Sequence, residues 1–288
     1  MLEQELQNYR RDLALRGYSP RTQSTYYRCL VSFLEYCGEP TEKITKENIK
    51  NYLYHLIDGQ KLSESSLRQA RSAICYFFSQ TIGREVEVAN IPIQKKKRKL
   101  PEVFTVEEVF RIIHSADNLK HKTILMLTYS SGLRVGELVN LKVSDISRDS
   151  MRLKVRDGKG GKDRYTLLSE ICLNQLEDYW KTYRPCSWLF CGRYPGEQIS
   201  IRAVQHAYHR AKKRAGITKQ CGIHTLRHSF ATHMIETGSG VFQLQKFLGH
   251  RHLTTTLVYV HLNEEKAVAR SPLDVYADRF KNESSSNR

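Results

Sequence analysis

The chain has 288 residues and a formal net charge of +16, with 46 lysine and arginine residues against 30 aspartate and glutamate residues. This length accommodates about two ordinary domains, each with its own core. The charge excess favours a polyanionic partner over a merely basic surface. No apolar run approaches the roughly 18 residues of a membrane-spanning helix, and the first residues lack the charged-then-apolar plan of a signal peptide. These features argue against a membrane partner.

The seven cysteines are widely spread, odd in number and include no C-x-x-C pair. This pattern indicates free thiols in a reducing compartment, so we expect a cytoplasmic protein. Cys186 and Cys191 could form half of a zinc site, but no second pair of suitable spacing follows. The sequence therefore predicts no bound metal.

Residues 1–90 are predicted to form an N-terminal helical domain. Gly17 ends a first amphipathic segment, and Ser19 followed by Pro20 is typical of a helix start, with serine as the N-cap and proline at the first helical position. Helices are expected at about 2–16, 20–36, 45–57 and 63–81. Four short helices joined by short loops indicate a small bundle.

A basic run closed by Pro101 follows this bundle. Its consecutive positive charges repel one another and will not pack in a core, so residues 91–101 are predicted to be a linker. The run could lie on a phosphate backbone as a strap, which we favour, or act as a nuclear localisation signal. Its candidate DNA-binding residues are Lys95, Lys96, Lys97, Arg98 and Lys99.

Residues 102–288 are predicted to form the second domain, which begins with Thr105 before an acidic first helical turn. Helices are expected at about 105–115, 119–131, 134–141, 169–183, 200–215, 225–237, 241–248 and 254–261. Residues 151–156 and 164–167 flank a glycine-rich turn at 158–161, which is typical of a β-hairpin. The fold class is therefore mainly α, with one small β-hairpin or sheet.

Arg134 is a candidate for binding a phosphodiester, whose negative charge grows in a pentacoordinate transition state. A guanidinium donates two hydrogen bonds at once and keeps its proton. Gly132 permits a sharp turn just before this arginine. Glu137, three residues on, could hold Arg134 in orientation or simply pair with it at the surface.

His224 and Arg227 lie three residues apart at a predicted helix start, so their side chains share one face. This pairing would couple a proton acceptor to a second phosphate-binding arginine. His228 and His233 belong to the same helix. We interpret both as structural, because neighbouring apolar residues such as Phe230 indicate a half-buried packing face.

Lys159 occupies the predicted hairpin tip, where flanking glycines let the backbone approach a ligand closely. With an ordinary pKa of about 10.4, a lysine there could protonate a departing sugar 5′-oxygen. Lysine in a glycine-rich turn is also common as plain solvated surface. Lys162 is a rival candidate and a further predicted DNA-binding residue.

Tyr259 is the candidate nucleophile. A phenol with an ordinary pKa of about 10 reacts poorly until a base or nearby cations draw off its proton. Its apolar setting, residues 255–260, would ordinarily indicate core packing. His250, just past the helix-stopping Gly249, could hydrogen-bond a phosphate.

These segments, taken together, resemble the tyrosine recombinase (phage integrase) family. The matching stretches are residues 131–138, 224–233, and 248–250 followed by 255–259. Residues 158–162 resemble the hairpin lysine motif of that family. The resemblance covers about 101–265 strongly, and the region before it resembles the SAM-like core-binding domain. Lacking an added arm-binding module, the chain resembles the simple two-domain Xer-like type.

The resemblance implies a site-specific DNA recombinase that needs no metal and no nucleotide cofactor. Tyr259 would attack the scissile phosphate, form a 3′-phosphotyrosine and release a 5′-hydroxyl. By the same resemblance, Arg134, Arg227 and His250 would bind the phosphate. Lys159 would protonate the leaving oxygen, and His224 would assist proton transfer. Glu137 would support Arg134.

The resemblance also implies double-stranded DNA with an inverted-repeat core site, on which a homotetramer joins two duplexes through a Holliday junction. The tail from 262 to 280 carries apolar residues that could fold on their own domain or dock as a helix on a neighbouring protomer. Accessory proteins or a second recombinase are further partners to expect, in a cytoplasmic, nucleoid-associated setting. The role would be resolution, integration or transposition of a prokaryotic replicon or mobile element.

Two other functions fit parts of the same pattern. A type IB topoisomerase shares the chemistry but relaxes supercoils as a monomer. A catalytically silent DNA-binding protein would share the positive charge but form no covalent adduct with DNA.

Overall fold

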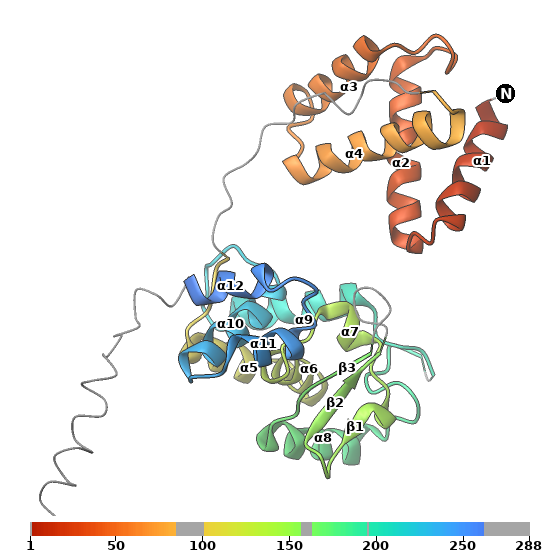
Figure 1. The fold of residues 1–288 in the computed structure, drawn as a ribbon. Helices are drawn as coiled ribbons and strands as arrows, with labels where there is room; N and C mark the ends of the chain where they lie inside the picture. Colours follow the sequence, from red (N-terminus) through yellow and green to blue (C-terminus); the bar gives the residue numbers. More distant parts are fainter. Residues whose placement is uncertain (1, 85–100, 157–162, 195, 262–288) are drawn as a thin grey trace, which may run out of the picture. The chain divides into compact units, whose positions relative to one another are not determined.

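The computed structural model describes residues 2–84, 101–156, 163–194 and 196–261, and the chain divides into two compact units, Met1–Arg98 and Lys99–Arg288 (Figure 1). Each unit has its own hydrophobic core. The mainly helical fold class with a small antiparallel sheet is confirmed. Among the residues described, no helix is both long and apolar enough to cross a lipid bilayer.

The first unit is a helical bundle whose helix starts follow the sequence signals. Its helices are α1 (Leu2–Leu15), α2 (Pro20–Cys37), α3 (Lys46–Asp58) and α4 (Glu64–Tyr76), followed by a π-helix at Phe77–Ile82. Ser19 caps α2 by accepting the backbone N–H of Thr22. The fourth predicted helix differs at its end, because its last turns widen into the π-helix. This widening agrees with the burial of two adjacent aromatic side chains, Phe77 and Phe78.

The second unit combines helices with a small antiparallel sheet of three strands in the described residues. Its helices are α5 (Val106–His114), α6 (Leu119–Ser130), α7 (Val135–Val139), α8 (Glu170–Tyr183), α9 (Ile201–Arg214), α10 (His224–Glu236), α11 (Val241–Leu248) and α12 (Thr254–His261). Its strands are β1 (Ile146–Ser147), β2 (Arg152–Val155) and β3 (Arg164–Leu167). The predicted hairpin is present as β2 and β3, with Leu153 opposite Thr166. The short β1 pairs antiparallel with β2 and was not predicted.

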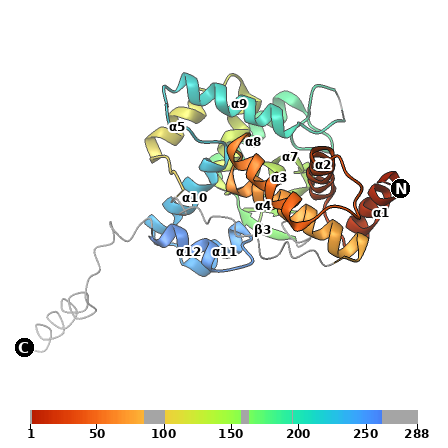
Figure 2. The same ribbon diagram turned by 90° about the horizontal axis from the view of Figure 1, so that it is seen from above.

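A satellite cluster of apolar side chains brings the last helices together. Helices α10, α11 and α12 contact one another, and α11 also lies against β3 (Figure 2). The cluster consists of Phe230, Ala231, Leu244, Leu248 and Tyr259. Gly132 ends the α6 turn with φ +61°, and a Cβ there would lie 2.4 Å from Cδ1 of Phe230. Only glycine therefore allows this turn to pack so closely on α10.

Candidate active site

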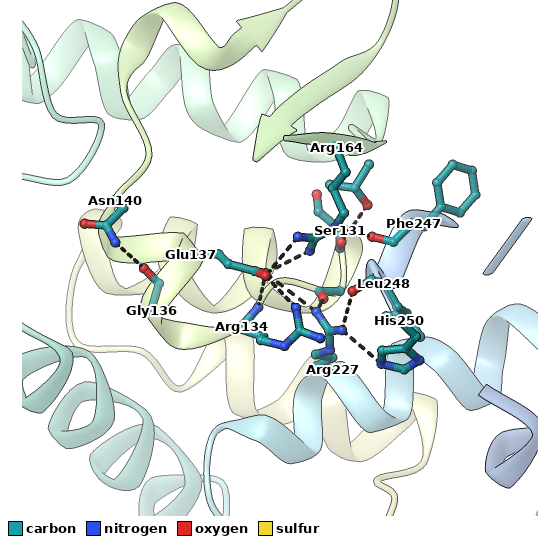
Figure 3. A network of polar contacts seen from close by, with 12 residues as sticks. Ser131, Arg134, Gly136, Glu137, Asn140, Arg164, Arg227, Phe247, Leu248 and His250 are labelled. Atoms are coloured by element: carbon teal, nitrogen blue, oxygen red, sulfur yellow. Dashed lines mark hydrogen bonds and ion pairs between the residues drawn. The ribbon is translucent and has the colours of Figure 1, made fainter. Parts of the chain in front are cut away.

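Glu137 lies at the centre of a network of arginines in the second unit (Figure 3). Its Oε2 accepts the backbone N–H of Arg134 at 2.8 Å, and its Oε1 accepts Nη1 of the same residue at 2.7 Å. This capping contact at the start of α7 fixes the backbone and the side chain of Arg134 together. Glu137 lies three residues after Arg134 in the sequence, and in the structure the two side chains form a direct ion pair.

Two further guanidinium groups approach the same carboxylate. Arg164 donates Nη1 and Nη2 to Glu137 at 2.8 Å each, and Arg227 Nη1 lies 3.6 Å from Oε2. Burial alone would favour a neutral carboxyl group. The hydrogen bonds and charge of Arg164, the backbone N–H of Arg134 and the charge of Arg227 outweigh it and lower the pKa of Glu137 to about 2. One negative charge therefore faces three positive ones, which leaves a net positive site for a polyanion.

Arg227 is 4% exposed and its guanidinium joins three segments of the chain. Nη1 donates to the carbonyl of Gly132 at 2.7 Å, and Nη2 donates to the carbonyl of Leu248 at 2.6 Å. Burial and the charge of Arg134 lower the pKa of Arg227 to about 9, so the side chain remains charged at neutral pH. These bonds hold the guanidinium rigidly beside the other arginines.

His250 is held on both sides of its ring. Arg227 Nη2 lies 3.2 Å from Nε2, and Thr256 Oγ1 lies 3.0 Å from Nδ1. A guanidinium can only donate, so Nε2 accepts and the proton of the neutral ring resides on Nδ1. Burial, followed by the charge of Arg227, lowers the pKa of His250 to about 3. In this arrangement His250 positions Arg227, and donation to a phosphate requires a proton on Nε2.

Tyr259 is buried in the satellite cluster, with 3% of the residue exposed. Its hydroxyl lies 2.8 Å from Nδ1 of His228, and its ring stacks on that of His250 with centroids 6.4 Å apart. Burial raises the pKa of Tyr259, while the charges of Arg227 and Arg134 lower it. The nucleophile candidate, two arginines and two histidines are thus gathered in one region.

His228, interpreted from the sequence as structural, makes a contact with the candidate nucleophile that the sequence did not predict. Its ring meets the Tyr259 hydroxyl directly, and burial together with the charges of His224 and Arg227 lowers the pKa of His228. A neutral His228 can accept a hydrogen bond from the phenol. His233, by contrast, lies 2.9 Å from the hydroxyl of Tyr129 through Nδ1.

The remaining predicted residues fall into two groups. His224 is exposed at the start of α10, and partial burial of its ring and the charges of Arg227 and Arg134 lower its pKa. Lys159, Lys162 and the basic run 95–99 lie outside the described residues, as does the tail from 262.

Comparison with known proteins gives the family. The phage integrase family model matches residues 102–266, and the model of its N-terminal SAM-like domain matches residues 6–88. The chain belongs to the phage integrase family. This family membership, together with Xer relatives, makes the chain a tyrosine-type site-specific recombinase.

Relatives of this recombinase cover nearly its whole length. It is 38% identical over 261 residues to a putative integrase/recombinase y4qK of Sinorhizobium fredii, covering 90% of this chain and 85% of that protein. It is 36% identical to the tyrosine recombinase XerA of Pyrococcus horikoshii, covering 91% and 93%. The crystal structure of a lambda integrase dimer (residues 75–356 of that protein) bound to a COC′ core site matches with a TM-score of 0.72 at 25% identity, covering 88% and 96%.

Arg164 is the other site residue that motif reasoning misses in this recombinase. Strand residues two apart face the same side of a sheet, and Thr166 is buried with its hydroxyl donating to the carbonyl of Ser131 at 2.8 Å. Arg164 therefore points inward, whereas Tyr165 between them is exposed. The apolar Tyr165 and Leu167 alternate with Arg164 and Thr166, so the sequence pattern predicts the opposite face as the inward one and carries no signal for Arg164.

Proposed function

We propose that this recombinase cuts and rejoins double-stranded DNA through a covalent 3′-phosphotyrosine on Tyr259. The observation that carries the proposal is the proximity of the Tyr259 side chain to Arg227 and His250 in one buried, positively charged region. The phenol oxygen forms a bond to phosphorus, and the bond from phosphorus to the 5′-oxygen breaks. Arg134 and Arg227 bind the non-bridging oxygens, where charge accumulates in the transition state.

Two protons move in this step, and different side chains handle them. His228 lies at hydrogen-bond distance from the Tyr259 hydroxyl, which supports it as acceptor of the phenol proton. Lys159 gives a proton to the departing 5′-oxygen, and His224 assists proton transfer near the arginines. His250 joins the phosphate-binding set once its Nε2 carries a proton.

Burial of Tyr259 means that the nucleophile must become accessible before attack. Only 3% of Tyr259 is exposed, so a phosphate cannot reach the phenol oxygen unless α12 shifts. We propose that binding of DNA and of neighbouring protomers produces this shift. The tail from 262 then docks on the next protomer, so deletion after residue 266 should spare single-site DNA binding and weaken recombination.

The complete reaction requires an assembly on DNA. We propose that residues 1–90 and 102–288 close around a duplex as DNA-binding and catalytic domains, with the basic linker 91–101 along the phosphate backbone. Four protomers join two inverted-repeat core sites and exchange strands through a Holliday junction. The net charge of +16 supports this partner. The biological role is resolution, integration or transposition of a prokaryotic replicon or mobile element.

The test uses DNA that flanks the gene, searched for an imperfect inverted repeat with a short central spacer. A nicked suicide version of this site lets the released strand diffuse away and traps the covalent adduct on a denaturing gel. We expect an adduct with the wild-type protein and recombinant products from paired sites on plasmids. Sequence-independent relaxation without recombinants would favour a type IB topoisomerase, and DNA binding without adduct would favour a silent DNA-binding protein.

A further inference from the structure

Arg164 has all its side-chain nitrogens engaged within the protein. This first residue of β3 has a side chain that is 10% exposed. Nε donates to the carbonyl of Phe247 at 2.9 Å, and Nη1 and Nη2 donate to the two oxygens of Glu137 at 2.8 Å (Figure 3). The fork of a guanidinium matches a carboxylate in this two-bond geometry. The Arg164 side chain therefore bonds to other protein groups and joins β3 to Glu137 and Phe247.

The end of α11 is held by two arginines side by side. Arg164 binds the carbonyl of Phe247 and Arg227 binds the carbonyl of Leu248. The last carbonyls of a helix have no partner within the helix and carry partial negative charge, so cations stabilise them. Arg164 thus connects β3 to α7 through Glu137 and to the end of α11 at the same time.

The next residue, Gly249, shows how closely Arg164 packs there. Gly249 ends α11 with φ +62°, and a Cβ on it would lie 2.7 Å from Cδ of Arg164. A side chain at this position would displace the arginine stem. His250 follows directly in the chain, so Arg164 packs against the turn that leads into His250.

Charge gives Arg164 a second effect on the site. Glu137 has Arg134 and Arg227 as its other charged neighbours, the latter at 3.6 Å. With Arg164 present, both carboxylate oxygens are already paired with its fork. Without it, Arg134 and Arg227 alone would balance the charge of Glu137, and the site would hold one positive charge fewer for a phosphate.

We propose that Arg164 is a positioning residue for the reaction: it fixes Glu137, and through it Arg134 and Arg227, together with the end of α11 that carries His250. This inference rests on the proposed function of the same site. The role belongs to arginine, because a lysine ammonium is a single point charge that cannot bond both carboxylate oxygens and the Phe247 carbonyl in this geometry.

The test compares Arg164→Lys with wild type in single-turnover cleavage of two suicide substrates. One has an ordinary scissile phosphate, and the other has a methylphosphonate, in which a methyl group replaces a charged non-bridging oxygen. Misplaced arginines should slow cleavage of the ordinary phosphate by about 10²-fold. The loss on the neutral methylphosphonate should be smaller by about tenfold or more, because less charge needs stabilisation. Arg148→Lys, which changes a surface ion pair with Glu177, is the matched control and should behave as wild type on both substrates.

A second pair of variants displaces Arg164 without removing it. Gly249→Ala introduces the Cβ that meets the arginine stem, and Gly238→Ala places the same residue in a left-handed position, φ +84°, with nothing within 4 Å. We expect the substrate-selective loss for Gly249→Ala only. This comparison remains decisive if Arg164→Lys fails to fold, since strain of the left-handed backbone is common to both glycine variants.

The outcomes separate this inference from the proposed function. Full activity of Arg164→Lys would show that Arg164 has no positioning role. An equal loss on both substrates, together with altered thermal unfolding, would show that its role is merely structural. A wild-type protein that forms no adduct at Tyr259 would overturn the proposed function, and this inference with it.

Discussion

The hydroxyl of Tyr259 and Nδ1 of His228 lie 2.8 Å apart, which links the candidate nucleophile on α12 to a histidine on α10. Because the pKa of His228 is lowered, mainly by burial, the ring is neutral at pH 7 and presents an acceptor to the phenol. In the proposed reaction the phenol proton passes to His228 through this contact, and the leaving 5′-oxygen receives a proton from a different residue, Lys159.

His228→Gln should keep DNA binding and slow single-turnover cleavage by about 10²-fold at pH 7, since glutamine accepts a hydrogen bond but takes no proton. The wild-type rate should fall as the pH drops through the lowered pKa of His228, and the variant should lose that dependence. His233→Gln, on the same helix beside Tyr129, is the control. Wild-type cleavage by the His228 variant would assign the proton to another acceptor.

Tyr259→Phe should abolish the covalent adduct and leave DNA affinity within a few-fold of wild type, as a gel-shift titration would measure. Loss of the hydrogen bond to His228 should cost about 1 kcal/mol in the free energy of unfolding. Tyr165→Phe, at an exposed position, should retain the adduct. An adduct that persists in the Tyr259 variant would place the nucleophile elsewhere.

Lys159→Ala should slow cleavage of ordinary DNA by about 10²-fold or more, because the 5′-alkoxide then leaves without a proton. A substrate with sulfur at the 5′-bridging position should restore most of the rate, since a thiolate leaves unprotonated. Lys162→Ala serves as the comparison. If the Lys162 variant, and not the Lys159 variant, cleaves ordinary DNA slowly and recovers on the sulfur substrate, Lys162 is the general acid.

The DNA-free protein should lose stability as the pH falls below neutral. His250 has a pKa of about 3 in the folded chain against an ordinary value of 6.5. Between these values the unfolded chain binds a proton that the folded chain does not, so the free energy of unfolding falls with falling pH. The contribution of His250 over the whole window is on the order of a few kcal/mol.

His250→Gln should make the decline between pH 7 and 5 shallower in chemical denaturation. A residual slope remains, because burial also lowers the pKa of other histidines, including His224 and His228. His252→Gln, at an exposed neighbouring position, should leave the wild-type slope. Equal slopes for all three proteins would mean that His250 is not neutralised by its surroundings.

Local chemistry predicts most of the secondary structure of this chain. Ser19 before Pro20 and Thr105 before an acidic turn are capping signals read within a few residues, and both helices begin there. The β1 strand escapes prediction because it has only two residues and depends on pairing with β2. The π-helix after α4 depends on packing of Phe77 and Phe78, which the sequence period does not encode.

The resemblance to the family motifs implied that Arg134, Arg227, His250 and Tyr259 share a site. They lie close together in the structure, and their catalytic roles stay a prediction. The contacts of His228 and Arg164 join segments that are distant in the chain, so no local pattern could reveal their partners. Arg164 and Glu137, for example, are 27 residues apart in sequence and meet only through the fold.

The long sequence separations within the arginine network have a consequence for biosynthesis. Arg227 reaches the carbonyl of Gly132 across 95 residues, and the bond to Leu248 needs a segment synthesised later still. Non-local contacts of this kind form only after the intervening chain has collapsed. A fragment that ends before α11 lacks the carbonyl of Leu248, so the arginine network is complete only after α11 has been synthesised.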